Sequence, residues 1–251
     1  MRYFLQLAYK GTHFHGWQKQ QNAATIQDFV DKALETILKH EIESIGSGRT
    51  DTGVHARNQF VHFDTQIELT SFTHIKKINA LMPYEIVPLK LFKAQNSEAS
   101  ARFDAINRSY RYEASDFPNP FWRELVTTLR KTPDIALMNE AAKLLLQHDD
   151  FETFSKVSDD TLHTRCDIQK AIWHKNEEGK FIFDITANRF LRGMVRLIVG
   201  NLLEVGNEKI TVEEFKQRML AKNRQLSAPA APADGLYLQE VTYPTGLLTE
   251  V

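Results

Sequence analysis

Residues 46–56 decide how the N-terminal part of this chain is organised, and they read Gly46-Ser47-Gly48-Arg49-Thr50-Asp51-Thr52-Gly53-Val54-His55-Ala56. This composition predicts a loop of defined shape, because glycine adopts backbone angles closed to other residues and lets a ligand approach the main chain. Such a loop can hold the carboxylate of Asp51 out toward a substrate. The alternative is an ordinary turn in which Asp51 caps its own backbone. A phosphate-binding loop is disfavoured, because the second glycine is not followed by lysine.

The segments on both sides predict a rigid frame for this loop. Upstream, Thr25 can cap a helix over 26–38, whose apolar residues recur at helical spacing. Downstream, residues 60–63 (Phe-Val-His-Phe) predict a strand with two alternating faces. The loop is therefore expected to be anchored at both ends.

Strand and helix patterns alternate along the whole chain. Strands are predicted over 3–9, 59–64, 86–94, 108–114, 167–173, 180–187 and 236–243, and helices over 26–38, 72–81, 135–146, 189–205 and 212–220. Pro118 and Pro120 break regular structure in a link over 116–121. The link separates an N-terminal lobe, 1–115, which carries the loop, from a C-terminal lobe, 116–251. This order predicts an α+β fold with a mixed, mostly antiparallel sheet covered by helices.

Composition limits the classes of function. The 251 residues carry a formal net charge of −1, which argues against a uniformly basic nucleic-acid binder, so RNA contact would need a local basic surface. Cys166 is the only cysteine, which excludes an intrachain disulfide and a cysteine-based zinc site. The histidine pairs 13/15 and 55/62 lack further ligands at metal-binding spacing, so local hydrogen bonding or packing is the favoured interpretation. The N-terminus lacks the apolar core of a secretory signal and no apolar run could span a bilayer, which indicates a cytoplasmic protein.

Several motifs along the chain are similar, in the same order, to those of the tRNA pseudouridine synthase A family. The loop Gly-Arg-Thr-Asp-x-Gly-Val-His resembles that family's catalytic loop. The other matching stretches are 9–18 (Tyr-Lys-Gly-Thr-His-Phe-His-Gly-Trp-Gln), 25–27 (Thr-Ile-Gln), 79–83 (Asn-Ala-Leu-Met-Pro), 101–105 (Ala-Arg-Phe-Asp-Ala), 108–112 (Arg-Ser-Tyr-Arg-Tyr), 190–196 (Phe-Leu-Arg-Gly-Met-Val-Arg) and 232–238 (Pro-Ala-Asp-Gly-Leu-Tyr-Leu). The resemblance covers nearly the whole chain and implies a central sheet crossed by a cleft between two similar lobes.

The resemblance implies conversion of uridine to pseudouridine in tRNA, at positions 38 to 40 of the anticodon stem and loop, by a homodimer. The reaction breaks the bond from ribose to N1 of uracil and joins C5 to the same sugar carbon. No atom is gained or lost, so no cofactor and no metal is required. What the protein must supply is a carboxylate, a pocket for the detached base and exclusion of water. The resemblance assigns the role of this carboxylate to Asp51, which would act as a nucleophile on ribose or uracil or as a base at C2′.

A carboxylate enclosed with an uncharged base needs a fixed cation nearby to stay ionised, and arginine suits that role. The family suggests Arg196, and the predicted helix places Arg189, Arg192 and Arg196 opposite its apolar face. A solvated position is the favoured interpretation of Arg192, whereas Arg189 is left open between solvent and phosphate.

Three further residues complete the predicted site. By its match to the family pattern, Tyr110 faces the substrate base, on which its ring can stack, whereas Tyr112 is expected in the core. Leu236 would form an apolar wall of the pocket, or be an ordinary strand residue. Arg49 lies two residues from Asp51 and suits phosphate contact or a part in flipping the target nucleotide. Arg57 is expected to be a plain surface charge.

Two other classes of function fit parts of these observations. A non-catalytic RNA-binding module could use the same basic and aromatic surface, but it has no use for a carboxylate that repels phosphate. A nucleoside hydrolase would release free uracil.

Overall fold

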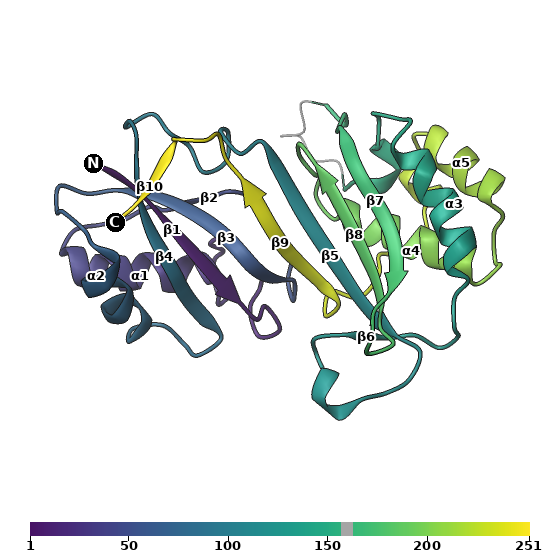
Figure 1. Ribbon diagram of the computed structural model, residues 1–251, viewed down its shortest axis with the longest axis horizontal. Helices are drawn as coiled ribbons and strands as arrows, with labels where there is room; N and C mark the ends of the chain where they lie inside the picture. The colour runs from purple at the N-terminus through teal and green to yellow at the C-terminus, as the bar shows by residue number, and fades with distance from the viewer. Residues whose placement is uncertain (157–162) are drawn as a thin grey trace. The chain divides into compact units, whose positions relative to one another are not determined.

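The structure is a computed structural model that describes residues 1–156 and 163–251 (Figure 1). The chain divides into two compact units: unit 1 comprises Met1–Asn107 and Leu238–Val251, and unit 2 comprises Arg108–Tyr237. The C-terminal residues therefore return to the unit in which the chain begins. These bounds differ from the lobes 1–115 and 116–251, whose division of functions stays a prediction.

Unit 1 is built on a sheet with strand order β10-β4-β1-β3-β9. The strands are β1 (Arg2–Tyr9), β2 (Ile45–Gly46), β3 (His55–Asp64), β4 (Ile86–Ala94), β9 (Leu236–Thr242) and β10 (Leu248–Glu250), with β9 belonging to unit 1 from Leu238 onward. Strand β1 pairs antiparallel with both β3 and β4, β10 pairs antiparallel with β4, and the short β2 pairs antiparallel with β3. The two longest strands of the unit, β3 and β4, therefore flank β1, and β3 begins directly after the loop that carries Asp51.

The helices α1 (Ile26–Leu38) and α2 (Ser71–Asn79) complete unit 1 (Figure 1). As predicted, Thr25 caps α1: its side chain accepts a hydrogen bond from the backbone N–H of Asp28. The buried apolar side chains of α1, Ile26, Val30, Ala33, Leu34 and Leu38, lie at the predicted helical spacing. This apolar stripe and the fully buried Tyr3, Leu5 and Leu7 of β1 form the core of the unit, and their removal from water stabilises it.

Unit 2 contains the strand order β5-β8-β7, in which each neighbouring pair is antiparallel. Its elements are β5 (Asn107–Ser115), β6 (Thr127–Thr128), β7 (Ile168–Lys175), β8 (Phe181–Ala187), the helices α3 (Ile135–Leu145), α4 (Met194–Gly206) and α5 (Val212–Leu220), and the short 3₁₀ turns η1 (Pro120–Trp122), η2 (Glu152–Phe154) and η3 (Arg224–Leu226). Strand β6 pairs in parallel with the end of β5. Helix α3 packs on β7 and contacts α4 and α5. Trp173 and Phe183 stack in the core at a centroid distance of 5.0 Å.

The predicted α+β class with a mostly antiparallel sheet is confirmed. The helix predicted over 189–205 is wrong at its start, because α4 begins at Met194 and Gly193 precedes it with a left-handed φ of +71°. Arg189 and Arg192 therefore lie before the helix, and only Arg196 lies on it. The strand predicted over 59–64 begins four residues earlier, at His55. The short strands β2, β6 and β10 were not predicted, because two or three residues carry no periodicity.

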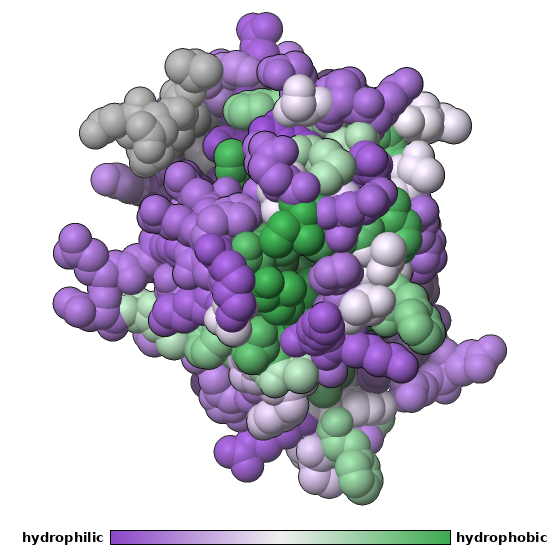
Figure 2. All heavy atoms as spheres, turned by 90° about the vertical axis from the view of Figure 1, so that its left-hand side faces the viewer, coloured by the Kyte–Doolittle hydropathy of each residue, from purple (hydrophilic) through white to green (hydrophobic). Residues whose placement is uncertain are grey.

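Unit 1 exposes a set of large apolar side chains. Phe72 and Tyr84 are 83% and 88% exposed, and Val87 and Leu89 of β4 are 40% and 41% exposed. Figure 2 shows hydrophobic side chains gathered among hydrophilic ones on the face that it draws. Within residues 1–156 and 163–251, no helix combines the length and apolar character needed to cross a membrane.

Candidate active site

The loop over 47–54, which carries Asp51, lies between β2 and β3. Its first residues are fixed to β3, because Ser47 donates its backbone N–H to the carbonyl of Phe60 at 2.7 Å and its hydroxyl to Gln59 Oε1. The Gln59 amide in turn donates to the carbonyl of Gly48 at 2.9 Å. The start of the loop is therefore held against β3, and its end leads directly into β3, so both ends are attached to strands.

A second segment, residues 9–17, packs against this loop, and we call it the brace. The backbone N–H of Trp17 donates to the carbonyl of Thr50 at 3.1 Å, and Gly53 donates to Phe14 at 3.4 Å. The N–H of Gly11 donates to Nδ1 of His55 at 2.9 Å. Backbone groups of the loop are thus held from outside the loop, which restricts the directions that its side chains can take.

Asp51 lies at the centre of this arrangement. Its carbonyl accepts the N–H of Val54 at 3.1 Å, which closes a tight turn, and its side chain belongs to a half-buried residue. Thr50 on one side is 6% exposed, whereas Arg49 is exposed. The loop therefore presents one half-buried carboxylate and one solvent-accessible guanidinium two residues apart.

Arg196 lies in the first turn of α4 in unit 2, and its residue is half-buried. Its Nε donates to the carbonyl of Ala231 at 2.7 Å, and the backbone N–H of Ala231 donates back to the carbonyl of Arg196 at 2.9 Å. The pair ties the start of α4 to the connector before β9. The guanidinium is therefore fixed at Nε by the protein, which limits the entropy it loses on gripping an anion.

Tyr110 is a half-buried residue of β5, and its ring meets Phe190 edge to face at a centroid distance of 5.1 Å. Tyr112, on the same strand, is fully buried, as predicted for a core residue. Its hydroxyl contacts Thr127 Oγ1 at 2.7 Å, and burial raises the pKa of Tyr112 well above the ordinary value. Leu236, the first residue of β9, is 4% exposed.

The predicted site residues thus divide between the units: Arg49 and Asp51 in unit 1, and Tyr110, Arg196 and Leu236 in unit 2. Within unit 1 the structure brings Arg49 and Asp51 together on one loop. The assembly of all five into one site stays a prediction. Sequence reasoning quoted residues 9–17 only as a motif and did not foresee that they hold the loop. The signal in the sequence was the presence of two glycines, Gly11 and Gly16, in this motif. In the structure a Cβ at Gly11 or Gly16 would lie 2.6 Å or less from the backbone of Val54 or Thr50, so only glycine allows the brace to approach the loop this closely.

Several arginines have partners within the protein. Arg111 pairs with Asp184, with Nε and Oδ1 2.9 Å apart. Burial alone would raise the pKa of Asp184, but its hydrogen bond to Arg111 and the charge of that residue outweigh burial and lower the pKa. Arg189 contacts the ring of His163, and Arg108 donates to the carbonyl of Asn188 at 2.9 Å. Arg57 and Arg192 are exposed, as expected for surface charges.

Histidines and the single cysteine have structural settings. His55 accepts from the N–H of Gly11, and His62 accepts from the N–H of Ala101 at 3.0 Å, so both histidines make hydrogen bonds within the protein, with partners distant in the sequence. Cys166 is buried, which raises the pKa of its thiol to about 11. The described part of the chain brings together no group of three or more His, Cys, Asp or Glu side chains that could hold a metal ion.

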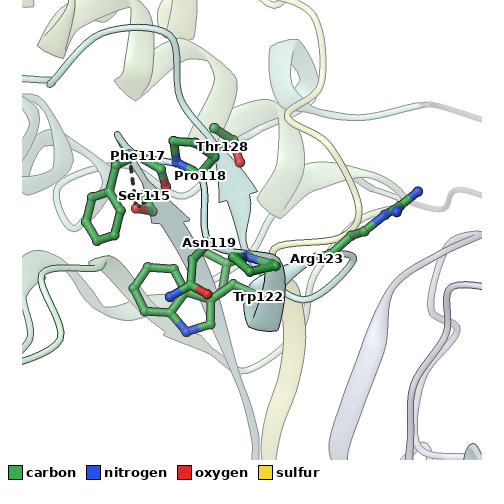
Figure 3. Close-up of a pocket in the computed structure, with 9 residues that line it drawn as sticks. Ser115, Phe117, Pro118, Asn119, Trp122, Arg123 and Thr128 are labelled. Carbon is green, nitrogen blue, oxygen red and sulfur yellow. Dashed lines mark hydrogen bonds between the residues drawn. The ribbon is translucent and has the colours of Figure 1, made fainter.

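A pocket of about 370 Å³ lies in unit 2, and none of the predicted site residues is among those that line it (Figure 3). Rings dominate its lining: Phe117, Pro118, Pro120 and Trp122. The Phe117 and Trp122 rings touch at a centroid distance of 5.4 Å, and Lys180 Nζ lies 4.8 Å from the centroid of Trp122. Because the rings of Phe117 and Trp122 contact each other, a base has no space between these two rings.

Comparisons with known proteins agree with the sequence motifs. A family model described as tRNA pseudouridine synthase matches residues 7–104 and 141–244. The chain is 42% identical to the tRNA pseudouridine synthase A of Bacteroides fragilis, over 97% of this chain and 96% of that protein. It is 39% identical to that of Porphyromonas gingivalis, over 98% of each chain, and 37% identical to that of Treponema denticola, over 97% of this chain and 93% of that protein. The chain therefore belongs to the tRNA pseudouridine synthase family.

Proposed function

We propose that this protein isomerises uridine to pseudouridine in tRNA and that Asp51 is the catalytic carboxylate. The observation that carries the proposal is the setting of Asp51, a half-buried acid on a loop clamped by β3 and the brace, in a chain of this family. In the reaction the bond between C1′ and N1 breaks, a bond between C1′ and C5 forms, the proton on C5 leaves to solvent, and N1 takes up a proton, so the product is an isomer of uridine. Asp51 can serve as nucleophile on ribose or uracil, or as base at C2′, and each of these roles needs its ionised form.

Release of tritium tests this proposal directly. tRNA carrying tritium at uracil C5 should lose it to water with the wild-type protein and keep it with Asp51→Asn, which is similar in size but lacks the charge. Binding of tRNA by the variant, measured by filter retention, controls for folding. Tritium release at the wild-type rate by the variant contradicts the proposal. Binding without release by the wild type supports an RNA-binding module instead, and free uracil in the product supports a hydrolase.

We assign Arg196 as the charge partner of Asp51. The support is the half-buried position of Arg196, the bond that fixes its Nε to Ala231, and the need of an enclosed carboxylate for a cation. Arg196→Met should reduce turnover far more than tRNA affinity, and Arg196→Lys should restore part of the rate, because it keeps the charge but loses the paired hydrogen bonds. A defect in affinity alone contradicts the assignment.

Tyr110, Leu236 and Arg49 are proposed as substrate contacts. The half-buried ring of Tyr110 suits stacking on uracil, which is worth about 1–3 kcal/mol per base. Leu236 would give the base an apolar wall, and the exposed Arg49 suits a phosphate of the flipped nucleotide. Arg49→Gln should weaken tRNA binding and lower its salt dependence, whereas Tyr110→Leu should slow turnover.

The target positions, 38 to 40 of the anticodon stem and loop, are part of the proposal. Transcripts that keep a single uridine at one of these positions test it, with a transcript that keeps uridine only in the T-arm as the control. Product in the control alone contradicts the assignment of the region.

We propose that the active form is a homodimer in the cytoplasm. Unit 1 exposes the large apolar side chains of Phe72, Tyr84, Val87 and Leu89, and a surface of this kind is often buried in an interface. Light scattering on the purified protein should give twice the mass of one chain. A monomer that is fully active contradicts the assembly, and fractionation of cells tests the location.

A further inference from the structure

We infer that Tyr9 is a positioning residue for the Asp51 carboxylate and that it acts through Thr50. This inference rests on the proposed catalytic role of Asp51 and names a residue outside the loop on which that role depends.

The hydroxyl of Tyr9 lies 2.8 Å from Oγ1 of Thr50, and the hydrogen bond is buried. Tyr9 is 4% exposed and Thr50 is 6% exposed, so water has little access to replace the bond. Tyr9 is the last residue of β1 and pairs there with Ala56 of β3 and Ile86 of β4. The hydroxyl therefore connects a strand held on both edges to the residue immediately before Asp51.

Thr50 is also held through its main chain. Its carbonyl accepts the N–H of Trp17 at 3.1 Å, so the side chain and the carbonyl of one residue are fixed by two different residues of the brace. A Cβ at Gly16 would lie 2.6 Å from that same carbonyl oxygen, which shows how closely the two backbones approach. With both groups fixed, the peptide joining Thr50 to Asp51 has one orientation.

The contribution of the Tyr9 hydroxyl can be tested separately from that of the ring. The Tyr9 ring stacks on Trp17 at a centroid distance of 6.4 Å and an interplanar angle of 30°. Phenylalanine at position 9 would keep this stacking and the buried volume and would remove only the oxygen. Thr50 would then be free to turn its side chain, and displacement of a reacting group by about 1 Å costs up to about a hundredfold in rate.

Tyr3 supplies a matched control on the same strand. It is fully buried, and its hydroxyl accepts the N–H of Leu69 at 3.1 Å, in a part of the unit that does not include the loop. Tyr3→Phe and Tyr9→Phe each remove one oxygen from a buried, hydrogen-bonded tyrosine of β1. The two variants should lose similar stability, so a difference in activity between them reports position rather than folding.

The experiment measures tritium release from C5-labelled tRNA by the wild type, Tyr9→Phe, Tyr3→Phe and Asp51→Asn, with urea unfolding of each. Tyr9→Phe should lower kcat about tenfold, the effect of one lost hydrogen bond that orients a reacting group, while KM for tRNA changes less than about twofold. Tyr3→Phe should stay within about twofold of the wild type in both constants.

A second variant tests the route through Thr50. Thr50→Val removes the other half of the hydrogen bond at nearly constant volume and should also lower kcat about tenfold. The double variant Tyr9→Phe/Thr50→Val should be no worse than either single variant, because both remove the same bond, whereas independent effects would multiply to about a hundredfold.

The outcomes separate this inference from the proposed function. If Asp51→Asn is inactive while Tyr9→Phe equals Tyr3→Phe in kcat, the positioning role is overturned and the catalytic role stands. Equal losses in Tyr9→Phe and Tyr3→Phe, tracking their stability, also overturn it. If Asp51→Asn turns over at the wild-type rate, the catalytic role fails and the positioning role fails with it.

Discussion

Two glycines of unit 1, Gly16 and Gly246, share a φ of +85° but lie in different settings. A Cβ at Gly16 would lie 2.6 Å from the carbonyl oxygen of Thr50 and 3.2 Å from the carbonyl carbon of Asp51. A Cβ at Gly246, in the turn before β10, would meet no heavy atom of the described residues within 4 Å. The same backbone angle therefore serves two purposes: at Gly246 it satisfies only a local turn, whereas at Gly16 it also makes room for the backbone of the loop that carries Asp51.

The largest expected effect comes from adding a methyl group at each position. Gly16→Ala should reduce tritium release at least about a hundredfold, because either the brace or the Thr50–Asp51 peptide must move. Gly246→Ala should keep the wild-type rate and lose about 1 kcal/mol of unfolding free energy from the strained φ alone. Activity and urea unfolding of the two variants check the comparison. Equal stability losses with wild-type activity in both would show that contact with the loop is unimportant.

Local sequence signals predicted most of the fold. The helices 26–38 and 212–220 and the strand 86–94 have the predicted bounds, because each has a strong period and a clear start. The glycine-rich composition of 46–56 predicted a loop, which the structure places at 47–54, and the flanking segments predicted that it is anchored; Ser47 bonds to β3 at its start, and its end leads directly into β3. These features depend on neighbours in the sequence, which a reader of the sequence can see.

Features that depend on distant neighbours were not predicted. The brace contacts the loop across about forty residues of sequence, and neither Tyr9 nor Thr50 carries a local mark of the bond between them. The ion pair of Arg111 was not predicted for the same reason, because its partner Asp184 is on another strand. At α4, periodicity extended into residues 189–193, because a left-handed Gly193 breaks a helix without changing the apolar pattern.

Two histidines of β3 differ in the same way: one holds the loop, whereas the other holds only the fold. His55 accepts from Gly11 of the brace, whereas His62 accepts from Ala101, outside it. Burial, with a smaller contribution from the charge of Arg2 and against the opposing charges of Asp64 and Asp104, lowers the pKa of His62 to about 4. The unfolded chain binds a proton at this side chain below about pH 6.5, which the folded protein resists. The contribution of neutral His62 to the free energy of unfolding is therefore complete above pH 6.5 and is lost as the pH falls through about 4.

His62→Asn should remove this part of the acid sensitivity. The wild type should lose up to about 3 kcal/mol of unfolding free energy through His62 between pH 6.5 and pH 4, by the 1.36 kcal/mol that each pKa unit represents. The variant keeps an acceptor for the Ala101 N–H and should show a shallower decline, with tritium release at pH 7.5 close to that of the wild type. Urea unfolding at several pH values checks the slope. A parallel decline in both proteins would assign the acid sensitivity to other groups.

The smallest expected effect concerns the N-terminus of α1, to which the brace is attached. Two N–H groups of its first turn donate to the brace, Ile26 to Gly16 at 3.1 Å and Gln27 to Trp17 at 3.0 Å. The first N–H groups of a helix have no acceptor within the helix, and here two of them donate to the brace, so the first turn of α1 also fixes the brace. Thr25 caps this turn through its side chain, whereas Thr70, at the same position of α2, makes no side-chain cap bond.

Comparing Thr25→Val with Thr70→Val therefore separates a side-chain cap on the helix that holds the brace from an N-cap position that makes no side-chain hydrogen bond. Valine keeps the volume of threonine and loses the hydroxyl, so Thr25→Val should cost about 1 kcal/mol of unfolding free energy, and Thr70→Val should change it by less than about 0.5 kcal/mol. Because the first turn of α1 holds Gly16 and Trp17, we expect Thr25→Val also to lower kcat by about twofold, while Thr70→Val does not change it. A loss of stability without any change in kcat would show that the brace stays in place when the helix end loosens, and that its contacts with the loop are sufficient to hold Asp51.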